Sequence, residues 1–155
     1  ARDANRAVAP LRPAADAVTI DTTGMAIDPD VIDIQVTVES LAAADEFADQ
    51  LLGAGYPRVE EITGDLAEPG ARSTAAGFDR TDRSTWWEKR FHASADPGRP
   101  TNVHIRVDGR PNQQFALLLV DWLAANPGAR LARLAVHEGY QRAWAWADST
   151  GWRPS

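Results

Sequence analysis

The sequence lacks cysteine altogether and has a single lysine among its 155 residues. Without cysteine, the chain has no disulfide, no thiolate nucleophile and no cysteine-ligated zinc site. The lysine, Lys89, follows Glu88, whereas a phosphate-binding P-loop needs a Gly-Lys-Ser or Gly-Lys-Thr segment. The chain by itself is therefore not a P-loop kinase.

Positive charge and long apolar runs are also scarce. The chain has 16 basic against 22 acidic residues and a net charge of −6, which argues against the clustered positive surface of a nucleic-acid-binding protein. No apolar run approaches the ~20 residues that span a bilayer. We therefore expect a cytoplasmic protein with neither nucleic acid nor a membrane as partner.

The hydrophobic pattern predicts strands and helices in mixed order. Residues 31–38 alternate between polar and apolar side chains, which predicts a strand with one buried face. Ser40 is a good N-cap for a helix from residue 41 to about residue 54. The other predicted elements are a short strand at 17–21, a weak strand at 59–62, a long polar loop at 64–85, and helices at 112–125 and 129–147, with Gly139 as a candidate break in the last.

A hairpin is predicted near the middle of the chain, with strands at 86–95 and 101–107 around a Pro/Gly turn. Together these elements favour the α+β class, as a small mixed sheet with helices packed mainly on one face. His92 and His104 each lie six residues from Gly98, and opposed residues of a hairpin share a face about 5 Å apart. The pair is expected either to bind phosphate when protonated or a metal when neutral, or to be two half-buried histidines with backbone partners.

Other charged and aromatic residues leave two interpretations each. Arg90 and Arg106 lie on the predicted hairpin, and with Lys89 and the loop arginines they either converge on a phosphate or are ordinary solvated charges. The tryptophan-rich tail, which includes Trp144 and Trp146, belongs either to the core or to a partner-docking patch. His137 lies on the last predicted helix and has no obvious companion.

Several segments resemble the GrpB family, in the version that is fused behind dephospho-CoA kinase in actinobacteria. Two of them read Lys89-Arg90-Phe91-His92-Ala93-Ser94-Ala95-Asp96-Pro97-Gly98 and Thr101-Asn102-Val103-His104-Ile105-Arg106-Val107. The others cover residues 30–38, 54–58, 114–123 and 142–152. The resemblance implies a nucleotidyltransferase-like domain at 30–155 that assists or regulates coenzyme A synthesis, next to a covalently or non-covalently associated kinase domain.

That fold implies a two-metal site which this sequence fills only in part. Nucleotidyl transfer uses metal ions held by carboxylates, and alternate strand residues share a face. Asp33 needs an acidic partner at 31 or 35, where the chain has Val31 and Gln35, and the Gly-Ser motif of the fold is replaced at 22–27. We therefore expect no catalytic residue. Asp33 is either half of a Mg²⁺ clamp, to be completed from another strand by an acid such as Asp108, or a hydrogen-bonded strand acid.

A second resemblance concerns residues 1–28, which resemble the C-terminal end of cytidylate kinase. An Asp-x-x-Arg pair contacts the nucleotide in that family, and Asp3 and Arg6 occupy its place. The resemblance implies a separate segment at 1–29 and, as an alternative function, a fragment of a CMP kinase. A protein-interaction module that uses the tryptophan-rich tail is the other alternative. For the domain itself, a nucleotide or phosphate ligand is expected at Asp33, His92, His104, Arg90 and Arg106.

Overall fold

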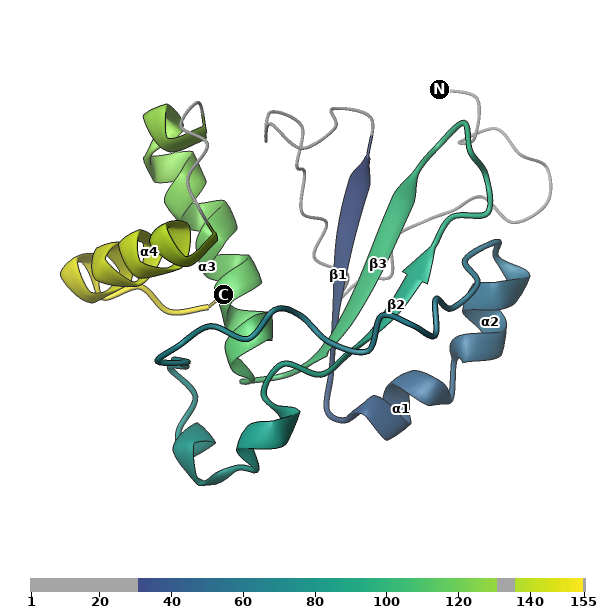
Figure 1. The fold of residues 1–155 in the computed structure, drawn as a ribbon, viewed down its shortest axis with the longest axis horizontal. Coiled ribbons are helices and arrows are strands. Elements are labelled where there is room, and N and C mark those ends of the chain that lie inside the picture. The colour runs from purple at the N-terminus through teal and green to yellow at the C-terminus, as the bar shows by residue number, and fades with distance from the viewer. Residues whose placement is uncertain (1–30, 131–135, 155) are drawn as a thin grey trace.

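The computed structural model describes residues 31–130 and 136–154, and it has one three-stranded mixed sheet. The strand order is β1-β3-β2, with β3 (Thr101–Val107) in the centre. β1 (Ile32–Val38) pairs with it in parallel and β2 (Lys89–Ala93) pairs with it antiparallel (Figure 1). The α+β class, the small mixed sheet and the predicted hairpin are confirmed.

One face of the sheet is apolar, as the alternation of β1 predicts. Val103 and Ile105 of β3 form a buried cluster with Ala44, and the aliphatic side chains of β1 pack against it. Helices α1 (Leu41–Asp45) and α2 (Ala48–Gly53) lie on this side. The Ser40 hydroxyl accepts a hydrogen bond from the Ala43 amide at 3.1 Å, so the predicted N-cap is confirmed.

The helix predicted at 41–54 is interrupted, because Glu46 and Phe47 leave the α-helical pattern. The Phe47 amide bonds to Ala44 O, three residues back, and its φ and ψ of −110° and 11° are not helical. Phe47 packs against the apolar cluster of the sheet. The prediction of one continuous helix was therefore wrong, although both halves are helical.

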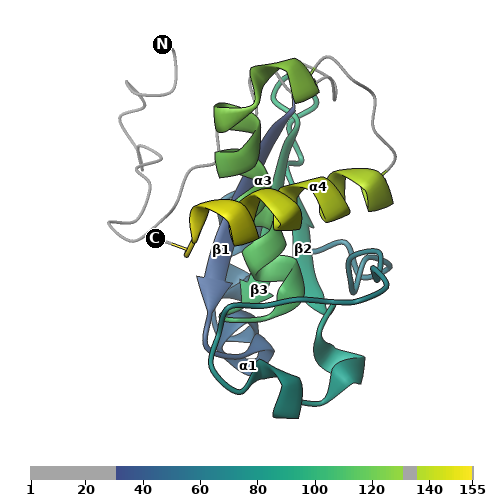
Figure 2. The ribbon, with the colours of Figure 1, turned by 90° about the vertical axis from the view of Figure 1, so that its left-hand side faces the viewer.

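Two longer helices form a second hydrophobic core. α3 (Pro111–Ala125) crosses α4 (Val136–Thr150), and Figure 2 shows the pair in front of the sheet, on the side opposite α1. Gly139 does not break α4. The buried side chains of this core include Leu118, Trp122, Tyr140, Trp144 and Trp152, with Trp146 packed against them. The tryptophan-rich tail is therefore core, and the helices are divided between the two sides of the sheet.

A long segment with little regular structure joins α2 to β2. Its short 3-10 turns are η1 (Phe78–Arg80) and η2 (Arg83–Thr85), and η3 (Pro127–Arg130) follows α3. The predicted strand at 59–62 is wrong: the segment forms isolated bridges, Arg58 to His92 and Gly64 to Glu88, and single backbone hydrogen bonds such as Val59 N to Phe91 O, but no strand. The segment runs from the α2 side of the sheet to the α3–α4 side (Figure 1).

Three expectations fall wholly or partly on residues that the structure does not describe. The strand predicted at 17–21, the nucleotide contacts Asp3 and Arg6, and the boundary near residue 29 all lie outside the described residues. Within 31–130 and 136–154, no helix has the length and apolar character that crossing a bilayer requires.

Candidate functional site

The hairpin register places the two histidines on opposite faces of the sheet. His92 pairs with Val103, whereas His104 pairs with Phe91. The pairing thus centres between Pro97 and Gly98, not on Gly98, and a shift of one residue moves a side chain to the other face. The prediction that His92 and His104 are opposed neighbours was therefore wrong.

His92 and Arg90 belong to the face that α1 and α2 cover. His92 is 2% exposed, and its ring Nδ1 donates to the Tyr56 carbonyl at 3.0 Å. This is the packed histidine with a backbone partner that the sequence left as an alternative. Arg90 points to the surface near α1, where its Nε and one terminal nitrogen donate to the two oxygens of Asp45 at 2.8 and 2.9 Å.

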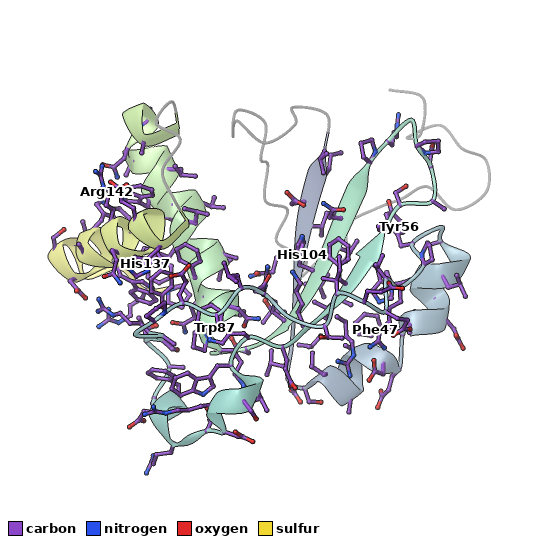
Figure 3. All side chains as sticks on the ribbon, viewed as in Figure 1. Phe47, Tyr56, Trp87, His104, His137 and Arg142 are labelled. Atoms are coloured by element: carbon purple, nitrogen blue, oxygen red, sulfur yellow. The ribbon has the colours of Figure 1, made fainter. Side chains whose placement is uncertain are left out.

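The other face carries a hydrogen-bonded group of charged and amide side chains, which we call the polar cluster. Asp33 and Gln35 come from β1, Asn102, His104 and Arg106 from β3, and Lys89 from β2. The loop adds Asp65, and the first turn of α3 adds Asn112. Figure 3 shows His104 between Phe47 and Tyr56 on one side and Trp87 and His137 on the other. Of the predicted site residues, the structure brings together Asp33, His104 and Arg106, with their faces set by the β1–β3 register.

Asp65 is the anionic centre of the polar cluster. Arg106 donates to it twice, from Nε at 2.8 Å and from a terminal nitrogen at 3.0 Å, and Lys89 Nζ donates at 2.6 Å. The side-chain amide of Asn112 donates to it as well, at 3.0 Å. Burial by itself raises the pKa of Asp65, but the bonds and charges of Arg106 and Lys89 outweigh it and hold that pKa well below the ordinary range. Asp65 is therefore ionised and paired.

His104 is held as a neutral imidazole with a defined tautomer. Its Nδ1 lies 3.2 Å from Lys89 Nζ and 3.3 Å from a terminal nitrogen of Arg106, and both of these groups can only donate. Nδ1 must accept, so the proton is on Nε2, which faces Asp33 Oδ1 at 3.4 Å. Burial lowers the pKa of His104, the bond to Asp33 acts against this, and the charges of Arg106 and Lys89 lower it further.

Asp33 and its neighbours do not fit a Mg²⁺ site. The hydrogen bond with His104 lowers the pKa of Asp33 against the effect of burial, and Asn102 donates to the same oxygen at 2.9 Å. Gln35, at the place of the second acid, binds Arg106 at 2.7 Å through its own oxygen. Mg²⁺ prefers carboxylate and water oxygens as ligands. Here the positively charged side chains of Lys89 and Arg106 contact His104, next to Asp33, and their charge disfavours a further cation. Among the described residues, no group of three or more His, Asp or Glu side chains is placed to hold a metal ion.

Sequence reasoning missed the loop acid and the helix amide of the polar cluster. Asp65 lies 41 residues before Arg106 in a loop without periodicity, so no spacing rule connects the two. Asp108, the acid that was considered as a partner for Asp33, is exposed after β3, and its backbone amide bonds to Val38 O. His137 does have a companion: its Nδ1 lies 2.8 Å from the buried Glu68 carboxylate.

Comparison with known proteins identifies a family and several relatives. The family described as GrpB protein matches residues 28–143. Proteins named dephospho-CoA kinase are similar to the chain: that of Mycolicibacterium paratuberculosis (strain ATCC BAA-968 / K-10) is 55% identical over 163 aligned positions, and the alignment covers 87% of this chain and 40% of that protein. Those of Mycobacterium tuberculosis (strain ATCC 25618 / H37Rv) and Mycobacterium leprae (strain TN) are 57% and 56% identical, over 81% and 80% of this chain and 36% of each relative. The chain thus spans less than half the length of these relatives.

Proposed function

This chain belongs to the GrpB protein family, and we propose that it serves a dephospho-CoA kinase as an accessory domain without nucleotidyl transfer of its own. The similarity to part of several proteins of that name supports the link to coenzyme A synthesis. We do not extend the kinase activity in the names of those relatives to this chain, because this chain has no P-loop.

One observation supports the non-catalytic part of the proposal: Gln35 occupies the place of the second metal-binding carboxylate and is bonded to Arg106. A two-metal reaction needs carboxylates that converge on both ions. Here Asp33 is bonded to Asn102 and His104, and the one further acid of the polar cluster, Asp65, is neutralised by Lys89 and Arg106. The acids of the polar cluster are therefore engaged in bonds that stabilise the fold, and they are not free to bind a Mg²⁺-nucleotide.

The catalytic part of the proposal is tested with the purified chain and labelled ATP and CTP. We expect no transfer of a nucleotidyl group to protein, water or added acceptors, and no difference in nucleotide binding between Mg²⁺ and EDTA in isothermal titration. Mg²⁺-dependent binding together with a nucleotidyl product contradicts the proposal. Asp33→Asn, which removes only the charge, shows whether any such activity belongs to this face.

The accessory role is tested with the kinase part of the Mycobacterium tuberculosis relative, freed of the segment that matches this chain. We expect the two pieces to associate, and the rate of coenzyme A formation to change when this chain is added. No association at tens of micromolar and an unchanged rate would remove the link to the kinase. Chemical-shift perturbation by CMP tests the alternative that involves Asp3 and Arg6, and millimolar CMP without effect excludes it.

A further inference from the structure

The polar cluster holds two buried cations, whereas the sheet itself supplies one carboxylate, Asp33, which is bonded to Asn102 and His104 and not to either cation. β2 and β3 supply Lys89 and Arg106, which are only 6% and 9% exposed. The carboxylate that neutralises both belongs to the loop, at Asp65, and neither strand provides it. A buried cation without a counter-ion is strongly unfavourable. This face of the sheet is thus stable only when an anion lies between the two cations.

Asp65 is held in the way that a bound oxyanion is held. It accepts hydrogen bonds from the guanidinium fork of Arg106, from the ammonium group of Lys89 and from the amide of Asn112. A planar fork with an ammonium group is a donor set that proteins use for phosphate as well as for carboxylate. Asn112 lies in the first turn of the 15-residue helix α3, whose amino end favours negative charge nearby.

The loop leaves this site directly after Asp65. Leu66, the next residue, is 74% exposed, and Gly64, the preceding one, is bridged to Glu88. The Asp65 amide also donates to Trp87 O at 2.8 Å. Withdrawing the carboxylate therefore needs the Asp65 side chain to rotate away or its backbone bond to Trp87 to break, while β2 and β3 keep Lys89 and Arg106 in place.

We propose that Lys89, Arg106 and Asn112 form a receptor for a phosphate group, in which Asp65 is an internal occupant that the phosphate replaces. The receptor goes beyond the accessory role, because it needs neither a metal ion nor the kinase. Free phosphate and a phosphate monoester share the chemistry that it recognises. Since the tethered carboxylate competes with any ligand, binding to the unaltered chain is weak and binding to a chain without that carboxylate is strong.

The experiment compares Asp65→Ala with a matched control, Asp45→Ala, which removes an exposed carboxylate paired with Arg90 on the other face. Isothermal titration with inorganic phosphate is run against chloride at equal ionic strength. We expect Asp65→Ala to bind phosphate at least about tenfold more tightly than the unaltered chain, and its melting temperature to rise with phosphate. Asp45→Ala should behave as the unaltered chain does, and adding Lys89→Met to Asp65→Ala should abolish the gain.

Several outcomes would overturn the proposal. If Asp65→Ala binds no phosphate, or binds it no better than the unaltered chain, the site is not a receptor that Asp65 occupies. If Asp65→Ala does not fold, Asp65→Asn keeps the size of the side chain, and phosphate must then shift the backbone NMR signals of Lys89, Arg106 and Asn112. AMP in place of phosphate distinguishes an ester ligand from the free ion. Mg²⁺-dependent nucleotidyl transfer would contradict the proposed function and leave this metal-free binding unaffected.

Discussion

The two faces of the small sheet are built from the same three strands and are stabilised by different forces. On one face, Val103 and Ile105 are buried under α1, and the free energy of burial scales with the apolar area removed from water. On the other face, directional hydrogen bonds hold Lys89, Arg106 and Asp65 in place, and few other arrangements would satisfy these charged groups. The apolar face should tolerate substitutions that keep volume, whereas the polar face should tolerate few that leave a charge unpaired.

The largest difference between the faces should follow from Arg106→Met. This substitution leaves the Asp65 carboxylate with half of its donors and leaves Gln35 Oε1 without its bond to Arg106. We expect a loss of about 3–5 kcal/mol in the free energy of unfolding. Urea unfolding followed by tryptophan fluorescence measures it. A loss below that of a single buried methyl group would mean that the polar cluster is solvated and not structural.

A smaller loss is expected when the apolar face loses one methyl group. Ile105 is 0% exposed at the centre of β3. Ile105→Val should lower the free energy of unfolding by about 1 kcal/mol, because it removes one buried carbon and leaves a small cavity. The same urea titration applies, and a loss as large as that of Arg106→Met would abolish the contrast between the faces.

The polar face should also make stability depend on pH below 6.5, through His104. The pKa of His104 lies below its ordinary value of 6.5, so the folded chain excludes a proton that the unfolded chain takes up. The stabilisation is complete above pH 6.5 and is lost as the pH falls below it. Asp65, whose pKa is lowered, adds a second loss as the pH falls below 3.8. Thermal unfolding between pH 7.5 and 5 should show a slope that His104→Gln reduces.

The smallest effect should come from Arg90→Met, the counterpart of Arg106→Met on the other face. Arg90 also has a bidentate aspartate partner, but Asp45 is 42% exposed. Water replaces much of what an exposed ion pair loses, so we expect a change below about 1 kcal/mol. Equal losses for the two arginines would show that burial does not distinguish the pairs, and 0.5 M salt should weaken only the Arg90 pair.

The sequence was sufficient to predict those features that repeat at short range. The alternation in 31–38 predicted β1, the Ser40 cap predicted the start of α1, and the helix predicted at 112–125 matches α3 to within one residue. Each of these rests on a period of two or 3.6 residues, or on a cap within one turn. The tryptophans of the tail are buried in the core, which is one of the two interpretations that the sequence allowed.

The site depended on features that no period encodes. The geometry of the hairpin turn decided whether the two histidines are opposed. In this turn the Asp96 side chain accepts a hydrogen bond from the Gly98 amide at 2.9 Å, and the strands pair about a point between Pro97 and Gly98. One residue of offset placed His92 on the face opposite to His104 and Asp33. The partnership of Asp65 with Arg106 and Asn112 joins a loop, a strand and a helix end, and only the folded chain brings these together.

The parallel pairing of β1 with β3 has a consequence for how the chain folds. Asp33 and Asn102, which face each other across this pair, are separated by 69 residues. Such a contact forms only after a long loop has closed, and chains dominated by distant contacts cross their folding barrier slowly. The hairpin of β2 and β3 is local by comparison and can serve as the template. We therefore expect the strand that carries Asp33 to dock late, so that Asp33 meets His104 only in the last steps of folding.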